Sequence, residues 1–281
     1  MYKCNICTDS FNKKNYLDAH NNLHIIQDAY LKNFIKYSFN DIKYIGDVPE
    51  VVFACWFGGY GTDIPLMSQT RFNCFRDLIN NIGIPIILIT SKNYKNFIKS
   101  NFPVHKSFEY LTGVHKTDYF RCYLMNHYGG GYHDIKSRNI SWSNEWEKDN
   151  WTSDDNIWMY GRREKNEGAI GYPPGMSHIK KEFSKMATMG WIICKKYTPF
   201  TKELMEQIHL SLDNHYKKLK IYPGVRSDGY YSDEPFELVP NNSYPIRWLE
   251  ILGEIYHPLM LKYTGYIKFE LPDANKSKRY K

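Results

Sequence analysis

Two charged residues that could take part in chemistry follow three consecutive glycines near the middle of the chain. They are Asp134 and Lys136, and together with Tyr132 they alternate along a short segment. If that segment is extended, the three side chains share one face. Upstream, Asp118 and Arg121 are three residues apart, so on a helix they also project from one face. Carboxylate oxygens suit hard divalent cations, and lysine and arginine can neutralise the charge of a phosphate.

The elements that must position these groups can be inferred from the same stretch, residues 115–136. Its first part carries apolar side chains at mixed three- and four-residue spacings, which predicts a helix. The glycines 129–131 should end that helix, because glycine accepts a left-handed cap without steric cost, and they would also let the backbone approach a bulky ligand. We therefore expect a helix, a glycine turn and a short strand, with Asp134 just past the strand end.

This stretch resembles the glycosyltransferases with a sugar-binding region that contains a DxD motif, in particular the capsular-polysaccharide-synthesis type. The glucosyltransferase domains of large clostridial toxins and yeast mannan-initiating enzymes resemble it more distantly. The shared pattern is a helix with SD-x-x-R followed by YGG-x-Y-x-D-x-D. Here it is Thr117-Asp118-Tyr119-Phe120-Arg121 and then Tyr128-Gly129-Gly130-Gly131-Tyr132-His133-Asp134-Ile135-Lys136. The resemblance covers roughly residues 48–270 and implies a GT-A-like fold.

The resemblance also implies roles for individual residues. In sugar transfer a cation-like sugar forms while negative charge builds on the leaving diphosphate, which the protein must stabilise. By position, Asp118 and Arg121 would hold the donor, Tyr132 would pack near the base or ribose, and Asp134 would lie at the ribose and metal. We place Trp56, Asp118, Arg121, Gly130, Gly131 and Tyr132 in the donor-binding set, and we take Asp134 and Lys136 as the candidate catalytic residues. The acceptor would be a glycan or a protein, and the anomeric configuration would be retained.

Lys136 departs from the family pattern, because it stands where the second carboxylate is expected. A protonated lysine cannot ligate a divalent ion. Either Asp134 and a distant carboxylate, for example Asp233 or Glu234, hold Mn²⁺ or Mg²⁺, or Lys136 itself neutralises the diphosphate. Our hypothesis is that Lys136 partly replaces the cation and lowers the metal dependence.

The N-terminus carries a complete Cys2His2 zinc-finger pattern. The ligands would be Cys4, Cys7, His20 and His24, with Phe11 and Leu17 as a small core. Two thiolates and two imidazoles suit tetrahedral zinc, and such units fold only when the metal binds. One finger covers about three base pairs, so it would be a weak reader of sequence. Nucleic-acid binding and protein docking both stay open as roles.

The remaining pattern predicts an α/β fold. Apolar runs at 50–56 and 84–90 indicate buried strands, and helical spacing follows at 67–80 and 94–100. This alternation favours a mostly parallel sheet flanked by helices, whose ligands bind beyond the carboxyl ends of the strands. We expect a ββα zinc finger at 1–27, a connecting helix and linker at 28–47, and a GT-A-like domain at 48–281.

Bulk composition narrows the class of protein. The 281 residues include 42% hydrophobic side chains, which can bury a full core, and the net charge of +7 permits phosphate-bearing ligands without demanding nucleic acid. No apolar run is long enough to predict a transmembrane segment, and no signal peptide is evident. Scattered cysteines suit a reducing compartment, so we expect a cytoplasmic location.

Two alternatives use the same residues. Asp118 with Asp134 and Lys136 mimics the acid, acid-x-lysine arrangement of metal-dependent nucleases, to which a zinc finger would deliver DNA. Against this, Asp118 lies inside a predicted helix, and the glycines have no role there. The other alternative is a zinc-finger regulator whose large domain only binds carbohydrate or protein.

Overall fold

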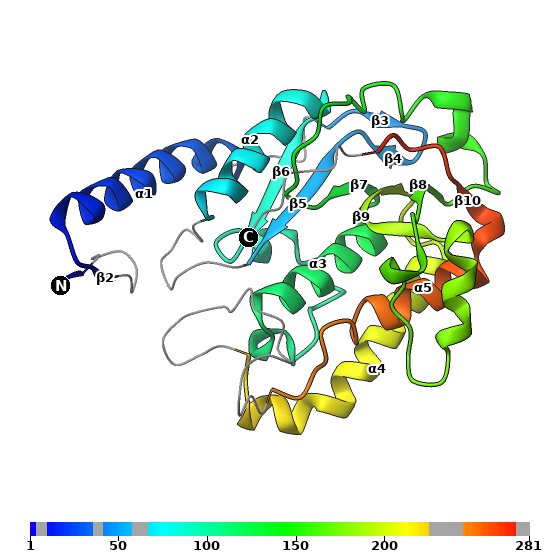
Figure 1. Cartoon of the computed structure of the whole chain (residues 1–281). Coiled ribbons are helices and arrows are strands. Elements are labelled where there is room, and N and C mark those ends of the chain that lie inside the picture. The colour runs from blue at the N-terminus through cyan, green and yellow to red at the C-terminus, as the bar shows by residue number, and fades with distance from the viewer. Residues whose placement is uncertain (4–9, 36–41, 58–66, 225–243, 274–281) are drawn as a thin grey trace.

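The structure is a computed structural model that describes residues 1–3, 10–35, 42–57, 67–224 and 244–273 (Figure 1). A six-stranded sheet in the order β10-β8-β9-β7-β5-β6 forms its centre. The strands are β5 (Val52–Trp56), β6 (Ile86–Thr90), β7 (Gly130–His133), β8 (Met159–Arg163), β9 (Ala187–Cys194) and β10 (Ile267–Lys268). Strands β6, β5 and β7 are parallel, as are β10 and β8, whereas β9 is antiparallel to both of its neighbours. The predicted α/β class with a mostly parallel sheet is confirmed, and the antiparallel β9 makes the sheet mixed.

Four of the helices in the described part of the chain cover the sheet, and local capping accounts for several of their ends. They are α2 (Gln69–Ile82), α3 (Gly113–His127), α4 (Pro199–Ile221) and α5 (Gly253–Lys262). Ser68 and Thr112 cap α2 and α3 by accepting hydrogen bonds from backbone amides of the first turn. Gly83 ends α2 in the left-handed conformation. Single-turn and short 3₁₀ helices lie at Tyr94–Phe97, Phe108–Tyr110, Lys148–Ser153, Glu167–Ala169, Ser177–Lys185 and Thr264–Tyr266.

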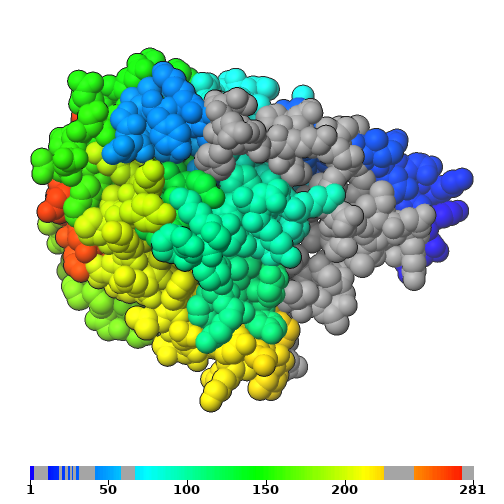
Figure 2. All heavy atoms as spheres, turned by 180° about the vertical axis from the view of Figure 1, so that it is seen from behind, coloured from blue at the N-terminus to red at the C-terminus, as the bar shows by residue number. Residues whose placement is uncertain are grey.

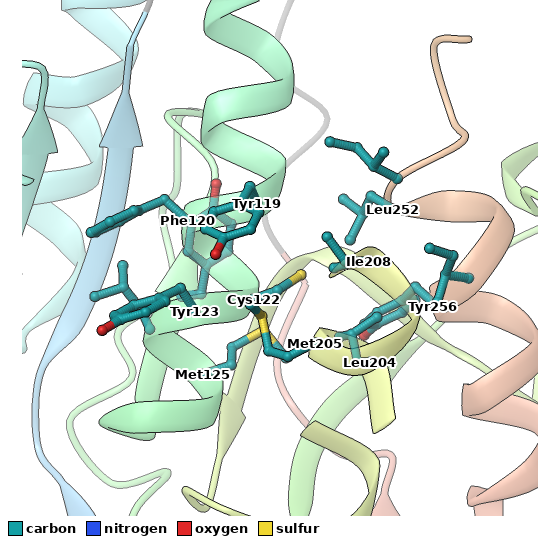
Figure 3. Close-up of a cluster of buried hydrophobic side chains, with 14 of the residues drawn as sticks. Tyr119, Phe120, Cys122, Tyr123, Met125, Leu204, Met205, Ile208, Leu252 and Tyr256 are labelled. Carbon is teal, nitrogen blue, oxygen red and sulfur yellow. The ribbon is translucent and has the colours of Figure 1, made fainter. Parts of the chain in front are cut away.

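Two hydrophobic cores lie on the two faces of the sheet. Helices α3, α4 and α5 share one, in which Tyr119, Cys122 and Met125 of α3 meet Leu204, Ile208 and Tyr256 (Figure 3). Helix α2 contributes to the other, with Trp142, Trp146 and Trp151. These three tryptophans are fully buried, so they serve interior packing. The four described cysteines, Cys55, Cys74, Cys122 and Cys194, are buried free thiols.

The N-terminal segment has a ββα order. Strands β1 (Tyr2–Lys3) and β2 (Ser10–Phe11) pair antiparallel, and α1 (Lys14–Ile35) follows. Helix α1 is continuous across residues 27 and 28, so the predicted boundary between finger and connecting helix falls inside it. Its N-terminal end projects from the body in both views (Figures 1 and 2). A small ladder of β3 (Tyr44–Ile45) and β4 (Val48–Pro49) leads into the sheet.

Part of the zinc-finger prediction lies outside what the structure describes. Cys4 and Cys7 are not among the described residues. The backbone of α1 includes His20 and His24, but the described contacts do not extend to their side chains. Zinc binding therefore stays a prediction. Within the described residues, no helix is both long and apolar enough to cross a bilayer.

Candidate active site

The carboxyl ends of three parallel strands meet at one edge of the sheet. Strand β5 ends at Trp56, which is in register with Thr90 at the end of β6, and β7 ends at His133. Asp134 follows directly, as the sequence predicts. In open α/β sheets, this edge is where ligands bind.

Asp134 is the centre of a cluster of charged and polar groups. Its Oδ1 accepts a hydrogen bond from the Tyr132 hydroxyl at 3.1 Å and lies 3.4 Å from an Arg121 nitrogen. Its Oδ2 lies 3.0 Å from Lys136 Nζ. The backbone amide of Asp134 donates to the Gly190 carbonyl at 2.7 Å, which fixes the residue against β9. The predicted common face of Tyr132, Asp134 and Lys136 is present.

Helix α3 delivers the second half of the cluster. Arg121 donates to Asp118 Oδ1 at 2.7 Å and to the Met189 carbonyl at 3.1 Å, and its guanidinium lies 4.7 Å from the centre of the Tyr132 ring. Asp118 and Arg121 are only 6% and 8% exposed, whereas the side chains of Asp134 and Lys136 are 24% and 26% exposed. Arg121 thus bridges the two carboxylates, and the open side of the cluster belongs to Asp134 and Lys136.

The two carboxyl groups of this cluster titrate differently. Burial alone would raise the pKa of Asp134, but the charges of Lys136 and Arg121 outweigh it and hold that pKa well below its usual range. Burial raises the pKa of Asp118 to about 6, although the charge of Arg121 opposes the shift. Asp134 is therefore ionised at neutral pH, and Asp118 changes its charge in the mildly acidic range.

Trp56 lies at the edge of the same region and is held by a residue that sequence reasoning missed. The Arg71 guanidinium, from α2, lies 5.6 Å from the centre of the Trp56 ring. Arg71 also donates to the carbonyl of Ile135 at 3.0 Å, between Asp134 and Lys136. No local pattern marks Arg71, because its partners lie 15 and 64 residues away in the chain.

Gly190 of β9 was also missed, although a glycine inside a strand often signals a close approach. A Cβ at this position would lie 3.1 Å from Asp134 Oδ2 and 3.6 Å from Lys136 Nζ. The Lys136 ammonium lies 5.3 Å from the centre of the neighbouring Trp191 ring. The antiparallel strand β9 thus forms one wall of the cluster.

The structure does not bring Gly130 and Gly131 to the cluster. They begin β7, at the opposite end of the strand from Asp134, and both are buried. Gly130 has a φ of +85°, and a Cβ there would lie 3.1 Å from the Pro49 carbonyl oxygen. A Cβ on Gly131 would lie 3.0 Å from Val52 Cγ2. Close strand packing accounts for these two glycines, whereas Gly129, with a φ of +71°, follows the end of α3 as predicted.

The described residues around Asp134 do not fit a divalent cation. Both of its oxygens already have partners, and two of these partners are the positive charges of Arg121 and Lys136. In the part of the chain that the structure describes, no group of three His, Cys, Asp or Glu side chains could hold a metal ion. Asp233 and Glu234, the other predicted carboxylates, lie outside that part. Two cations against two carboxylates make the cluster neutral, and protonation of Asp118 would make it positive.

Comparison with known proteins places the chain in a family. Residues 4–173 match the sequence profile of the family described as "Capsular polysaccharide synthesis protein". The match spans more than half of the chain, and the chain belongs to this family. Among solved structures it is similar to "PaToxG Glycosyltransferase", with 12% identity, a TM-score of 0.37, and coverage of 87% of this chain and 78% of that chain. No curated protein matches the chain.

Proposed function

We propose that this protein is a glycosyltransferase that moves a sugar from a nucleotide-sugar donor to a glycan or protein acceptor. One observation carries the proposal. Arg121 bridges Asp118 and Asp134 at the carboxyl ends of the parallel strands, with Lys136 beside them. Membership of the capsular polysaccharide synthesis family supports the same class of reaction.

In this proposal the carboxylates of the cluster bind the hydroxyl groups of the donor, and its lysine binds the diphosphate. The carboxylate oxygens of Asp134, and of Asp118 when it is ionised, accept hydrogen bonds from ribose or sugar hydroxyls. Lys136, the more exposed of the two cations, faces the diphosphate and stabilises the charge that builds as the sugar leaves. Arg121 is already held by three partners, so it fixes the carboxylates and adds a second positive charge nearby. We expect the transfer to retain the anomeric configuration, as the family resemblance implies.

Lys136 takes the place of the metal-binding carboxylate in this proposal. Lys136 Nζ lies 3.0 Å from Asp134 Oδ2, so it supplies one positive charge where a DxD pair would recruit a divalent ion. We therefore propose transfer that does not depend on Mn²⁺ or Mg²⁺.

We further propose that the N-terminal segment binds one zinc ion through Cys4, Cys7, His20 and His24. The ββα order of β1, β2 and α1 supports this assignment, because it is the order in which a Cys2His2 unit presents two thiolates and then two imidazoles.

The nuclease alternative with Asp118, Asp134 and Lys136 is not favoured. Asp118 lies within helix α3, and one of its oxygens accepts a hydrogen bond from Arg121 at 2.7 Å. A two-carboxylate metal site needs both groups free to ligate the ion. The arginine between the carboxylates occupies the position that such an ion would need.

The test is a panel of UDP- and GDP-sugars screened by thermal shift, followed by an assay of sugar release or transfer. A ligand that binds only the folded protein raises its melting temperature. We expect at least one nucleotide-sugar to do so and to be consumed by the enzyme. Stabilisation by duplex DNA and by none of the nucleotide-sugars would overturn the proposal.

A further inference from the structure

The C-terminal half of α1 is packed onto the body of the protein. The ring of Tyr30 meets the ring of Phe72 in α2 edge-on, with 5.4 Å between their centroids. Leu31, on the next position, is fully buried in the core that contains α2. This half of the helix is therefore part of the folded domain, although the ββα unit at its other end projects away from it (Figure 1).

Gln27 forms an unusual link at the point where α1 meets the body. Its side-chain amide nitrogen donates to the Met67 carbonyl at 2.7 Å, and its amide oxygen accepts from the Met67 backbone N–H at 2.9 Å. Gln27 is fully buried. Glutamine is rarely buried to this degree, and burying its amide is costly unless it is hydrogen-bonded. The side chain pairs with Met67 as a neighbouring strand would.

Met67 leads directly into the candidate site. It precedes Ser68, the N-cap of α2, whose hydroxyl accepts from the Arg71 amide at 3.2 Å. The Arg71 side chain then reaches the Ile135 carbonyl and the Trp56 ring. Ile135 lies between Asp134 and Lys136 in the chain, so two hydrogen-bonded contacts and one helix turn connect Gln27 to the cluster.

We infer that Gln27 is a positioning residue for the candidate active site. Helix α1, which bears the predicted zinc ligands, therefore helps to hold the site of the transferase in place. Gln27 fixes the start of α2, and α2 in turn fixes Arg71 over Trp56 and against the segment that holds Asp134 and Lys136. The inference that this segment binds donor rests on the proposed function. The positional link itself does not, and it can be measured without ligand.

The first measurement is hydrogen exchange in the peptide around residues 134–136 of the full-length protein. Gln27→Met keeps the length and volume of the side chain but removes both hydrogen bonds. Gln69→Met makes the same change at an exposed glutamine in the first turn of α2, where the amide contacts only Asn73 among the hydrogen bonds described. We expect exchange about tenfold faster in Gln27→Met, because two buried bonds are lost, and no change in Gln69→Met.

A double-mutant cycle tests whether the effect passes through Arg71. If it does, the effects of Gln27→Met and Arg71→Met on the exchange rate should not be additive. The double variant should then exchange no faster at 134–136 than Arg71→Met alone. Additive effects, or unchanged exchange in a folded Gln27→Met protein, would overturn the inference. If Gln27→Met does not fold, Gln27→Glu is the second variant. Its protonated carboxyl can keep both bonds, whereas its ionised form would set an oxygen against the Met67 carbonyl, so exchange at 134–136 should be faster at high pH than at low pH once corrected for the intrinsic exchange rate.

The same variants then separate this inference from the proposed function. With a nucleotide-sugar that binds the wild type, we expect Gln27→Met to weaken binding about tenfold, in line with two lost hydrogen bonds, and Gln69→Met to leave it unchanged. A wild type that binds no nucleotide-sugar would contradict the proposed function but not the positional link. Faster exchange at 134–136 with unaltered donor affinity would contradict the assigned positioning role alone.

Discussion

Lys136 Nζ lies 3.0 Å from Asp134 Oδ2, so the position where the sequence resemblance leads us to expect a second carboxylate instead holds the counter-charge of the first. Arg121 approaches the other oxygen of the same carboxylate at 3.4 Å. A pair of carboxylates would repel each other and attract a divalent cation. The arrangement here keeps Asp134 ionised without one, and leaves a partly exposed ammonium group at the rim of the sheet.

Lys136→Met should weaken donor binding. The substitution keeps the apolar stem but removes the charge that we assign to the diphosphate, and charge-assisted bonds to phosphate are roughly twice as strong as neutral ones. We expect the dissociation constant of the nucleotide-sugar to rise about tenfold or more, consistent with a lost bond to a charged group. Calorimetric titration measures it. Lys217→Met, at an exposed lysine on α4, is the matched control and should bind as the wild type does.

Lys136→Asp should make sugar transfer depend on a divalent metal ion. It restores a D-x-D pair, and two neighbouring carboxylates suit Mn²⁺ or Mg²⁺. We expect wild-type transfer to persist in EDTA, and the variant to be inactive in EDTA and to recover with Mn²⁺. Because EDTA would also remove the predicted zinc, each sample is re-supplied separately with Zn²⁺ and Mn²⁺. Wild-type activity that is lost completely and returns only with Mn²⁺ would contradict the assigned role of Lys136.

The pH dependence of stability should report on Asp118. Burial raises the pKa of Asp118 to about 6 from an ordinary value of 3.8, so the folded state binds this proton more tightly than the unfolded state. The stabilisation that follows is fully present below pH 3.8 and is lost as pH rises through about 6. Asp134 has the opposite shift, so its contribution changes only at lower pH. We expect the free energy of unfolding of the wild type to fall between about pH 4 and about pH 7 relative to Asp118→Asn, as measured by urea denaturation.

Donor binding should move in the other direction over the same range. The ionised form of Asp118 is the acceptor that we assign to donor hydroxyls, so affinity should improve as pH rises through about 6. Asp118→Asn should bind more weakly and lose this inflection. An inflection that persists in Asp118→Asn would assign the titration to another group.

The sequence could predict the part of the site that is built by residues close together in the chain. The spacing of Asp118 and Arg121, the glycine after α3 and the alternation from Tyr132 to Lys136 are all local, so helical and strand periods were enough to place them. Their meeting at the end of β7 then followed from the parallel order of the first strands.

The other half depends on sheet order, which no local pattern encodes. Strand β9 inserts antiparallel between β7 and β8 and brings Gly190 against Asp134. Helix α2 brings Arg71 to Ile135 across 64 residues. Gly130 and Gly131 illustrate the reverse problem. A glycine that admits a ligand and a glycine that admits a neighbouring strand look alike in a sequence, and only the strand contacts distinguish them.

Gly190→Ala should impair the site more than the fold. The new Cβ would lie 3.1 Å from Asp134 Oδ2, so the carboxylate or Lys136 must shift. Both side chains have exposed area into which they can move, so we expect a melting temperature within a few degrees of the wild type, about 1 kcal/mol or less. Donor affinity should fall about tenfold, because the Asp134–Lys136 geometry changes. Gly265→Ala, where a Cβ meets nothing within 4 Å, is the control.

Zinc content tests the N-terminal assignment and its connection to the rest of the molecule. We expect one zinc per chain by elemental analysis, and none in Cys7→Ser, because a structural site needs all four ligands. Cys74→Ser alters a buried thiol outside the pattern and should keep the metal.

Since α1 runs without a break from the predicted zinc-ligand residues to Gln27, loss of zinc should first speed hydrogen exchange in the N-terminal half of α1. If Gln27 and Leu31 hold the C-terminal half of α1 in place, hydrogen exchange at the Met67 amide should stay slow in Cys7→Ser. Equally faster exchange in the N-terminal half of α1 and at Met67 would show instead that the packing of α1 on the large domain depends on the metal.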